Sequence, residues 1–299
     1  MELSAVWDIM VAGILRGGLF VLMALGLSLI FGVMNIPNFA HGEFYMLGAY
    51  FAYFAYVLLE VNPILCILIA AFGGFACGSV IEMAAFKTLR RRSKGDWVMN
   101  SFLLTVGLSI VLQNAAQAVF GVRFMGIDSY WKGSVGWISN MNVTYDRLAA
   151  FGIAMATVGI FWAFLHKTRT GNSIRAVSED ENGAMLVGIN LNRIHTLTFA
   201  IGAMLAAIAG ATLLSINPAY PTMGLAPLYK SWFVVILVGM GNIWGTIIGG
   251  LLVGMVEAFS YYNLGAGWQD LVSLLVIILV LWLKPSGLFG KSVKGIWER

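Results

Sequence analysis

The residues of this sequence that could do chemistry stand inside or beside long apolar segments. The stretch Asn35–Glu43 joins two such segments and contains Asn38, His41 and Glu43. Polar groups are costly in hydrocarbon unless they face protein or a water-filled cavity. Pro37 also removes a backbone donor and disfavours helix at the preceding residue. One interpretation is an unwound segment that lines a solute route or its gate; the alternative is a polar turn at the membrane surface that caps the following helix.

A second interruption, Gly239–Gly250, breaks the apolar pattern in the C-terminal half of the chain. Paired breaks in the two halves of a transporter indicate a translocation site, although the two halves of this sequence show no clear repeat. Both breaks fall on the predicted cytoplasmic side, which favours a gate over an outward-facing pocket. The residues that we assign to the path or gate are Asn38, His41, Gly42, Glu43, Gln113, Gly241, Asn242 and Glu257.

Outside the two breaks, polar positions inside apolar segments include Glu82, Gln113, Asn114, Gln117 and Glu257. Gln113 and Gln117 are four residues apart and therefore share one face of a helix. They could line a polar path, and the alternative that we favour is hydrogen bonding between helices. Glu43 and Glu257 are the candidates for a buried ion-coupling site, but the sequence shows no obvious partner for either.

Catalytic and nucleotide-binding patterns are not found in the sequence. No H-E-x-x-H metal motif and no nucleophile–base pair occurs in the apolar segments. The tail contains Gly290-Lys291-Ser292, which matches the end of a phosphate-binding loop, but that motif needs glycine where Pro285 stands. We therefore expect no enzymatic activity, no cofactor and no bound ATP in this chain itself.

The composition is that of a membrane protein. Hydrophobic residues make up 60% of the chain and charged residues 11%, whereas soluble domains carry about 25% charged residues. The apolar segments, most of them near the ~20 residues that span a bilayer, are roughly 9–33, 38–59, 63–86, 99–121, 147–166, 194–216, 228–242, 246–262 and 268–284. The seventh is short, so it is a candidate half-helix or re-entrant segment. We expect one all-α polytopic transmembrane domain over residues 1–299, with eight or nine spans.

Small residues at every fourth position predict close contact between helices in this bundle. Examples are Gly74 with Gly78 and Gly250 with Gly254, and Ala203 and Ala207 extend the pattern. Without large side chains, helix backbones approach closely enough for dispersion to hold them together in lipid.

Basic residues indicate the orientation of the chain. They gather in the loop from Lys87 to Lys94, in the loop from Lys167 to Arg193, and in the tail from Lys284 to Arg299. These regions fall on one side in the nine-segment count, so that side and the C-terminus should be cytoplasmic. The N-terminus is then external, unless one segment is re-entrant. Because the net charge of +4 comes from loops and not from one basic face, no nucleic-acid partner is expected.

The loop at about 167–193 is too long for a simple connector, and its centre predicts a short helix on the cytoplasmic surface. Ser178 is the expected N-cap, and acidic residues follow in the first turn, where they oppose the helix dipole favourably. An apolar patch begins at Ala184 and includes Leu186, and Gly188 is the expected stop. Such a helix would serve as a docking knob for a partner; the alternative is a surface helix packed only on its own bundle.

Several of these stretches, taken together, carry a family resemblance that covers nearly the whole chain in order. They are Asn38–Tyr50, Leu108–Asn114, Arg175–Asp180, Leu186–Asn190, Leu197–Gly202, Ile247–Glu257 and Lys284–Gly290. The sequence resembles the permease subunits of bacterial branched-chain amino-acid ABC importers, a family that also includes importers of urea and short amides. Met240 and Trp244 are bulkier than is common in that family's C-terminal break, which leaves the solute open.

The resemblance implies an inner-membrane heterodimer with a second permease subunit, two ATPase subunits that bind ATP and Mg, and a periplasmic solute-binding protein. It implies that external loops, including Val122–Asp146 and Asn217–Lys230, receive the binding protein. The residues it implies for coupling to the ATPase are Ala176, Ser178, Glu179, Asp180, Ala184, Leu186 and Gly188. The alternatives are a permease for urea or short amides, an ion-gradient-driven transporter, and, last among transporters, a channel.

Overall fold

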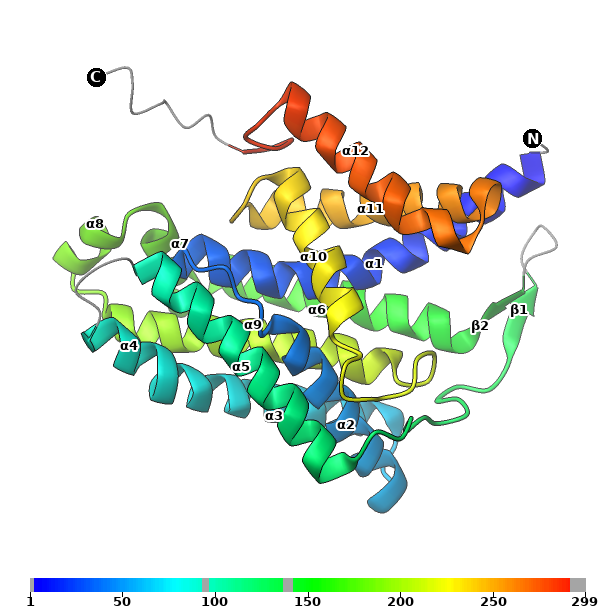
Figure 1. The fold of residues 1–299 in the computed structure, drawn as a ribbon, viewed down its shortest axis with the longest axis horizontal. Helices are drawn as coiled ribbons and strands as arrows, with labels where there is room; N and C mark the ends of the chain where they lie inside the picture. Colours follow the sequence, from blue (N-terminus) through cyan, green and yellow to red (C-terminus); the bar gives the residue numbers. More distant parts are fainter. Residues whose placement is uncertain (1–2, 93–96, 137–141, 291–299) are drawn as a thin grey trace.

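The computed structural model describes residues 3–92, 97–136 and 142–290, and over these the chain is a bundle of helices (Figure 1). The helices are α1 (Leu3–Met34), α2 (His41–Leu58), α3 (Pro63–Ile81), the π-helix η1 (Glu82–Phe86), α4 (Lys87–Arg92), α5 (Trp97–Phe120), α6 (Tyr145–Lys167), α7 (Arg169–Glu179), α8 (Glu181–Leu186), α9 (Leu191–Leu213), α10 (Leu225–Val238), α11 (Ile243–Leu264), the 3-10 helix η2 (Ala266–Trp268) and α12 (Gln269–Leu283). Two short antiparallel strands, β1 (Ser134–Gly136) and β2 (Asn142–Thr144), form a hairpin before α6.

Every predicted apolar segment is helical, which confirms the all-α polytopic bundle. Within the described residues, seven helices are long and apolar enough to cross a membrane. The two predicted segments outside that set are α2 and α10. α10 has only 14 residues and begins at Leu225, before the predicted 228–242. It ends at Val238, before the predicted end, because Gly239, at φ 99°, leaves the helical region. The expected count of eight or nine spans is therefore approximate.

The predicted small-residue contacts lie at the centre of the bundle. A methyl group at Gly74 or Gly78 would overlap α9 at Ala207 or Ala203. On the other side of α9, α1 packs against α11, where a methyl group at Gly254 would overlap the backbone of Gly17. α1 and α9 are the most buried spans. Close backbone contact therefore fixes a rigid centre, and the more peripheral helices attach to it.

The connecting segments divide between two ends of the bundle. α4, α7 and α8 lie at one end, and the β1–β2 hairpin and the start of α1 lie at the other (Figure 1). A hydrogen bond of 2.9 Å from Arg90 to Asn192 joins the two basic loops directly. The structure thus brings these loops together, as predicted, while Lys94 and the tail beyond residue 290 lie outside the described residues.

Candidate functional site

The first break is an unwound segment buried in the bundle. α1 ends at Met34, the chain reverses at Asn35 with φ 54°, and His41 then lies 3.0 Å from the carbonyl oxygen of Met23. Met23 precedes Met34 by eleven residues, or about 16 Å of helix, so the segment runs back along α1 into the interior. Asn38 and His41 are fully buried. α2 therefore starts inside the bundle, a geometry unlike that of a turn at the membrane surface.

α5 seals this segment with polar side chains at every fourth position. The Trp97 indole donates to the Met34 carbonyl at 3.3 Å. The Thr105 hydroxyl lies within donating distance of two carbonyl oxygens, that of Pro37 at 3.2 Å and that of Phe102 in α5 itself at 2.9 Å. An unwound backbone has carbonyl groups without helical partners, and these bonds satisfy two of them. The i, i+4 ladder consists of Trp97, Ser101, Thr105, Ser109 and Gln113.

The two C-terminal residues of the ladder contact Glu43. The Ser109 hydroxyl and the Gln113 amide each donate to Glu43 Oε1 at 2.8 Å. Glu43 is fully buried. The sequence analysis assigned Gln113 to the path but missed Ser109 and the rest of the ladder; the signal that would have found them is the four-residue spacing of polar residues in α5. Gln117, expected on the same face, is exposed instead.

Two helix N-termini meet next to Glu43. A methyl group at Gly42, in the first turn of α2, would overlap the carbonyl oxygen of Gly224, and one at Gly224, the N-cap of α10, would overlap that of Gly42. Glycine is therefore required on both sides of this crossing. The positive ends of two helix dipoles converge there, in the arrangement of discontinuous helices at transporter solute sites.

An aromatic cluster closes the same junction. The ring of Phe39 in the unwound segment packs edge-on against Phe102 of α5 at 5.3 Å and stacks on Trp232 of α10 at 5.4 Å. The unwound segment, α5 and α10 thus share one apolar contact, formed by the residue that follows Asn38 in the chain.

The second break lies beside the C-terminal end of α1, where the first break begins. Gly239 and Gly241 have positive φ angles, and the Asn242 side chain caps α11 by accepting from Gly245 N at 2.8 Å. The Asn242 amide also donates to the Phe289 carbonyl at 3.0 Å. Gly241 touches Gly32 near the end of α1. The structure therefore places Gly241 and Asn242 beside the start of the first break and away from Glu43.

The two bulky residues of this break do not fill its interior. Met240 and Trp244 are half exposed, and the Trp244 ring packs on His166 at the end of α6. Their size therefore alters the outer surface of the break.

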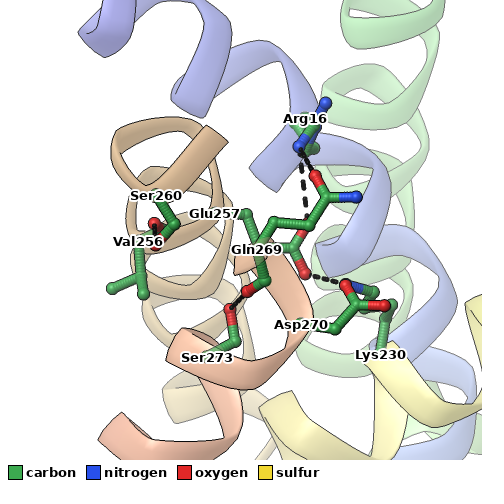
Figure 2. Close-up of polar contacts among 8 residues, drawn as sticks. All are labelled: Arg16, Lys230, Val256, Glu257, Ser260, Gln269, Asp270 and Ser273. Atoms are coloured by element: carbon green, nitrogen blue, oxygen red, sulfur yellow. Dashed lines mark hydrogen bonds and ion pairs between the residues drawn. The ribbon is translucent and has the colours of Figure 1, made fainter. Parts of the chain in front are cut away.

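Glu257 has charged partners that were not obvious from the sequence. It lies on α11, 2% exposed, and pairs with Lys230 of α10 and, at 3.6 Å, with Arg16 of α1. Lys230 also pairs with Asp270, and Arg16 donates to Gln269 at 2.8 Å, both in the first turn of α12 (Figure 2). The cluster holds two positive and two negative side chains and ties four helices together. Sequence could not reveal it, because the partners are far apart in the chain.

The predicted docking segment forms two helices. α7 is anchored to the bundle through the buried side chains of Ile174 and Val177. Ser178 is not an N-cap, because it lies in the last turn of α7; Asp180 caps α8 instead, accepting from Asn182 N at 3.0 Å. Glu179 is the last residue of α7.

α8 ends as predicted and presents an apolar patch. Gly188 has φ 85°, and two backbone bonds, from Gly188 to Met185 and from Ile189 to Ala184, form a Schellman motif. Ala184 is buried against the bundle and so does not belong to the patch, contrary to expectation. The exposed members are Met185, Leu186 and Val187, with Leu186 89% exposed.

The two loops that we expect to be external are joined to one another where the structure describes them. Met125 and Ala219 exchange two backbone hydrogen bonds, of 2.9 and 2.7 Å, and Phe124 packs on Tyr220. The second loop ends where α10 begins at Leu225, so Lys230 belongs to the buried cluster and not to this loop as expected. The two predicted loops thus form one surface at the hairpin end of the bundle (Figure 1).

Comparison with known proteins agrees with this architecture. Residues 9–281 match the family model described as branched-chain amino acid transport system / permease component. The chain is 32% identical to the high-affinity branched-chain amino acid transport system permease protein BraD of Pseudomonas aeruginosa, over 94% of this chain and 95% of that protein. It is 32% identical to the corresponding protein LivH of Escherichia coli, over 93% and 94%. It is 24% identical to the probable branched-chain amino acid transport permease protein LivH of Methanocaldococcus jannaschii, over 96% and 93%.

Proposed function

The chain belongs to the family of branched-chain amino acid transport permease components, and on that premise we propose that it is a translocation subunit of an ATP-binding-cassette importer. It lies in the bacterial inner membrane with its C-terminus in the cytoplasm. It works with a second permease subunit, two ATPase subunits that bind ATP and Mg, and a periplasmic solute-binding protein. The chain itself contributes no ATPase site.

The observation that carries this proposal is the exposed apolar patch on α8. Leu186 and Val187 are 89% and 76% exposed, whereas α7 next to them is anchored through Ile174 and Val177. Large exposed apolar side chains beside charged residues indicate a protein contact. α7 contacts α1, α6 and α9, so a partner that pulls on α8 would move the centre of the bundle.

The unwound segment lines the proposed path, and α5 is the helix that would move away from it. α5 covers it through the hydrogen-bond ladder. Most of the remaining surface of α5 is not buried in the bundle. Separating α5 from the unwound segment and α2 would uncover Glu43 and the Pro37 carbonyl, while His41 would stay against Met23 of α1 and the glycine contacts of the rigid centre would be undisturbed. Alternating access would then be a movement between these elements, driven by the docked ATPase subunits.

The solute that we propose is a branched-chain or other hydrophobic amino acid. Urea and short amides are the alternative within the same transporter class. An ion-gradient-driven transporter is less supported, because the relatives of this chain are permease components of branched-chain amino acid transport systems. Of the two candidate coupling carboxylates, Glu257 is already paired with Lys230 and Arg16, which leaves Glu43 alone.

Purification tests this proposal directly. The chain, expressed with its chromosomal neighbours and solubilised mildly, should co-elute with an ATPase subunit, and the complex should import solute only with ATP. Elution without any ATPase, together with uptake by the chain alone under an ion gradient, would contradict it.

A further inference from the structure

Among the residues that the structure describes, three glutamates of the helix bundle are buried, and one of them differs from the other two. Glu82 pairs with Arg90 at 2.7 Å and also accepts from Thr196. Glu257 pairs with Lys230 and Arg16. Glu43 is fully buried, yet in the described part of the chain no basic residue forms an ion pair with it.

The partners of Glu43 are neutral and occupy only one of its oxygens. Ser109 and Gln113 both donate to Oε1, and Oε2 is buried with no hydrogen-bond partner among the described residues. A buried carboxylate is very unfavourable unless it is paired or protonated. The site is therefore complete only when Oε2 carries a proton or meets a positive group from outside the chain.

We propose that Glu43 is the counter-ion for the ammonium group of the transported solute. This inference rests on the proposed function, and it adds the chemistry by which the spans recognise the solute. The solute would supply the cation that Arg90 and Lys230 supply to the other two glutamates. A charged ligand group paired in this way gives selectivity, because a solute without it leaves the carboxylate unpaired.

Buried groups elsewhere in the unwound segment and on α10 have the chemistry that the rest of such a solute needs. The side-chain nitrogens of Asn38 and Trp232 are buried donors without a partner among the described residues, and a carboxylate accepts from donors of this kind. The rings of Phe39, Phe102 and Trp232 form the apolar contact described above. An acceptor, two donors and apolar rings are the kinds of group that bind the ammonium, the carboxylate and the side chain of a small apolar amino acid.

The junction is closed in this structure, and α5 is the element that would open it. Gly42 and Gly224 are in backbone contact, and Ser109 and Gln113 cover Glu43. Both covering residues belong to α5, which is held by hydrogen bonds that solute groups can replace. Withdrawal of α5 would therefore exchange neutral donors on Glu43 for the ammonium group.

Equilibrium binding to the whole transporter in nanodiscs, without binding protein or nucleotide, tests this proposal. The probe is radiolabelled leucine, with two competitors: 3-methylbutylamine, which keeps the ammonium group, and 4-methylpentanoate, which keeps only the carboxylate. We expect the amine to compete with leucine and the acid to fail. Glu43→Gln keeps the shape and loses the charge, so it should weaken leucine binding about tenfold or more. Glu60→Gln, an exposed residue after α2, is the matched control and should bind leucine normally.

Three results would overturn the proposal: unchanged leucine binding by Glu43→Gln, equal competition by the acid and the amine, or no leucine binding by the unmodified transporter. The first would show that Glu43 is a protonated structural residue, since glutamine would replace it well. ATP hydrolysis and uptake, measured on the same preparation, separate this failure from failure of the proposed function. A transporter that imports leucine with ATP but shows one of these three results contradicts the ammonium site alone.

Discussion

Gly42 of α2 and Gly224 at the start of α10 are in direct backbone contact, although 182 positions of the chain separate them. Two helices that begin inside the bundle thus meet at their N-termini. The unwound segment, the ladder on α5 and the Phe39 cluster surround this contact. The proposed path can open only if Gly42 and Gly224 separate and α5 moves away from the unwound segment.

The glycine contact predicts that Gly42→Leu blocks transport. The new side chain would overlap the Gly224 backbone, and overpacking of this kind costs about 1–3 kcal/mol. We expect uptake to be lost and the melting temperature of the purified complex to fall. Gly152→Leu is the control, since α6 has open space at Gly152. Normal uptake by Gly42→Leu would restore the interfacial-turn interpretation.

The ladder predicts that Thr105→Val loosens the unwound segment. Valine keeps the shape but leaves the Pro37 carbonyl without its donor, which should cost about 1–2 kcal/mol. Hydrogen exchange at residues 35–40 should become faster. Thr157→Val in α6 is matched, because the Thr157 hydroxyl bonds only within its own helix, to Ile153. Equal exchange in both variants would mean that α5 does not hold the segment.

The charged cluster predicts a large cost for removing one partner. Lys230→Met leaves Glu257 buried beside a more exposed arginine, and such a change costs about 3–5 kcal/mol. Adding Glu257→Met should restore most of the lost thermal stability, since a neutral apolar pair packs without desolvated charge. A double variant as unstable as the single one would show that the pairing in Figure 2 is not what stabilises α10.

We predict that replacing Glu179 impairs coupling to the ATPase without reducing the stability of the protein. Its negative charge stands at the C-terminal end of α7, where the helix dipole disfavours it by about 0.3–1 kcal/mol. Glu179→Lys should therefore leave the protein at least as stable while uptake per ATP hydrolysed falls. Asn172→Lys adds the same residue to the exposed side of the same helix and should couple normally. Unaltered coupling in Glu179→Lys would remove this residue from the docking surface. Asp180→Lys is a poorer test, because Asp180 caps α8.

Local patterns in the sequence were enough to predict much of the fold. Apolar runs located every span, Gly188 marked the end of α8, and small residues at four-residue spacing marked the faces through which α3 and α9 pack closely, although not that they pack on each other. Each of these features depends on residues close in sequence and on general rules for lipid and helix termini.

Tertiary partners could not be predicted in the same way. The bond from Ser109 to Glu43 and the pairing of Lys230 with Glu257 join separate helices, so nothing local indicates them. The N-cap was assigned to Ser178 rather than Asp180, because both are good capping residues and only the start of α7 at Arg169 decides between them.

One measurement tests the docking account most directly: ATP-driven leucine uptake by proteoliposomes that contain the whole transporter with Leu186→Asp. The account predicts that the charge on the apolar patch of α8 releases the ATPase subunits and abolishes uptake, while Asn182→Asp on the same helix has little effect. Full uptake by Leu186→Asp, with the ATPase subunits still bound, would contradict it.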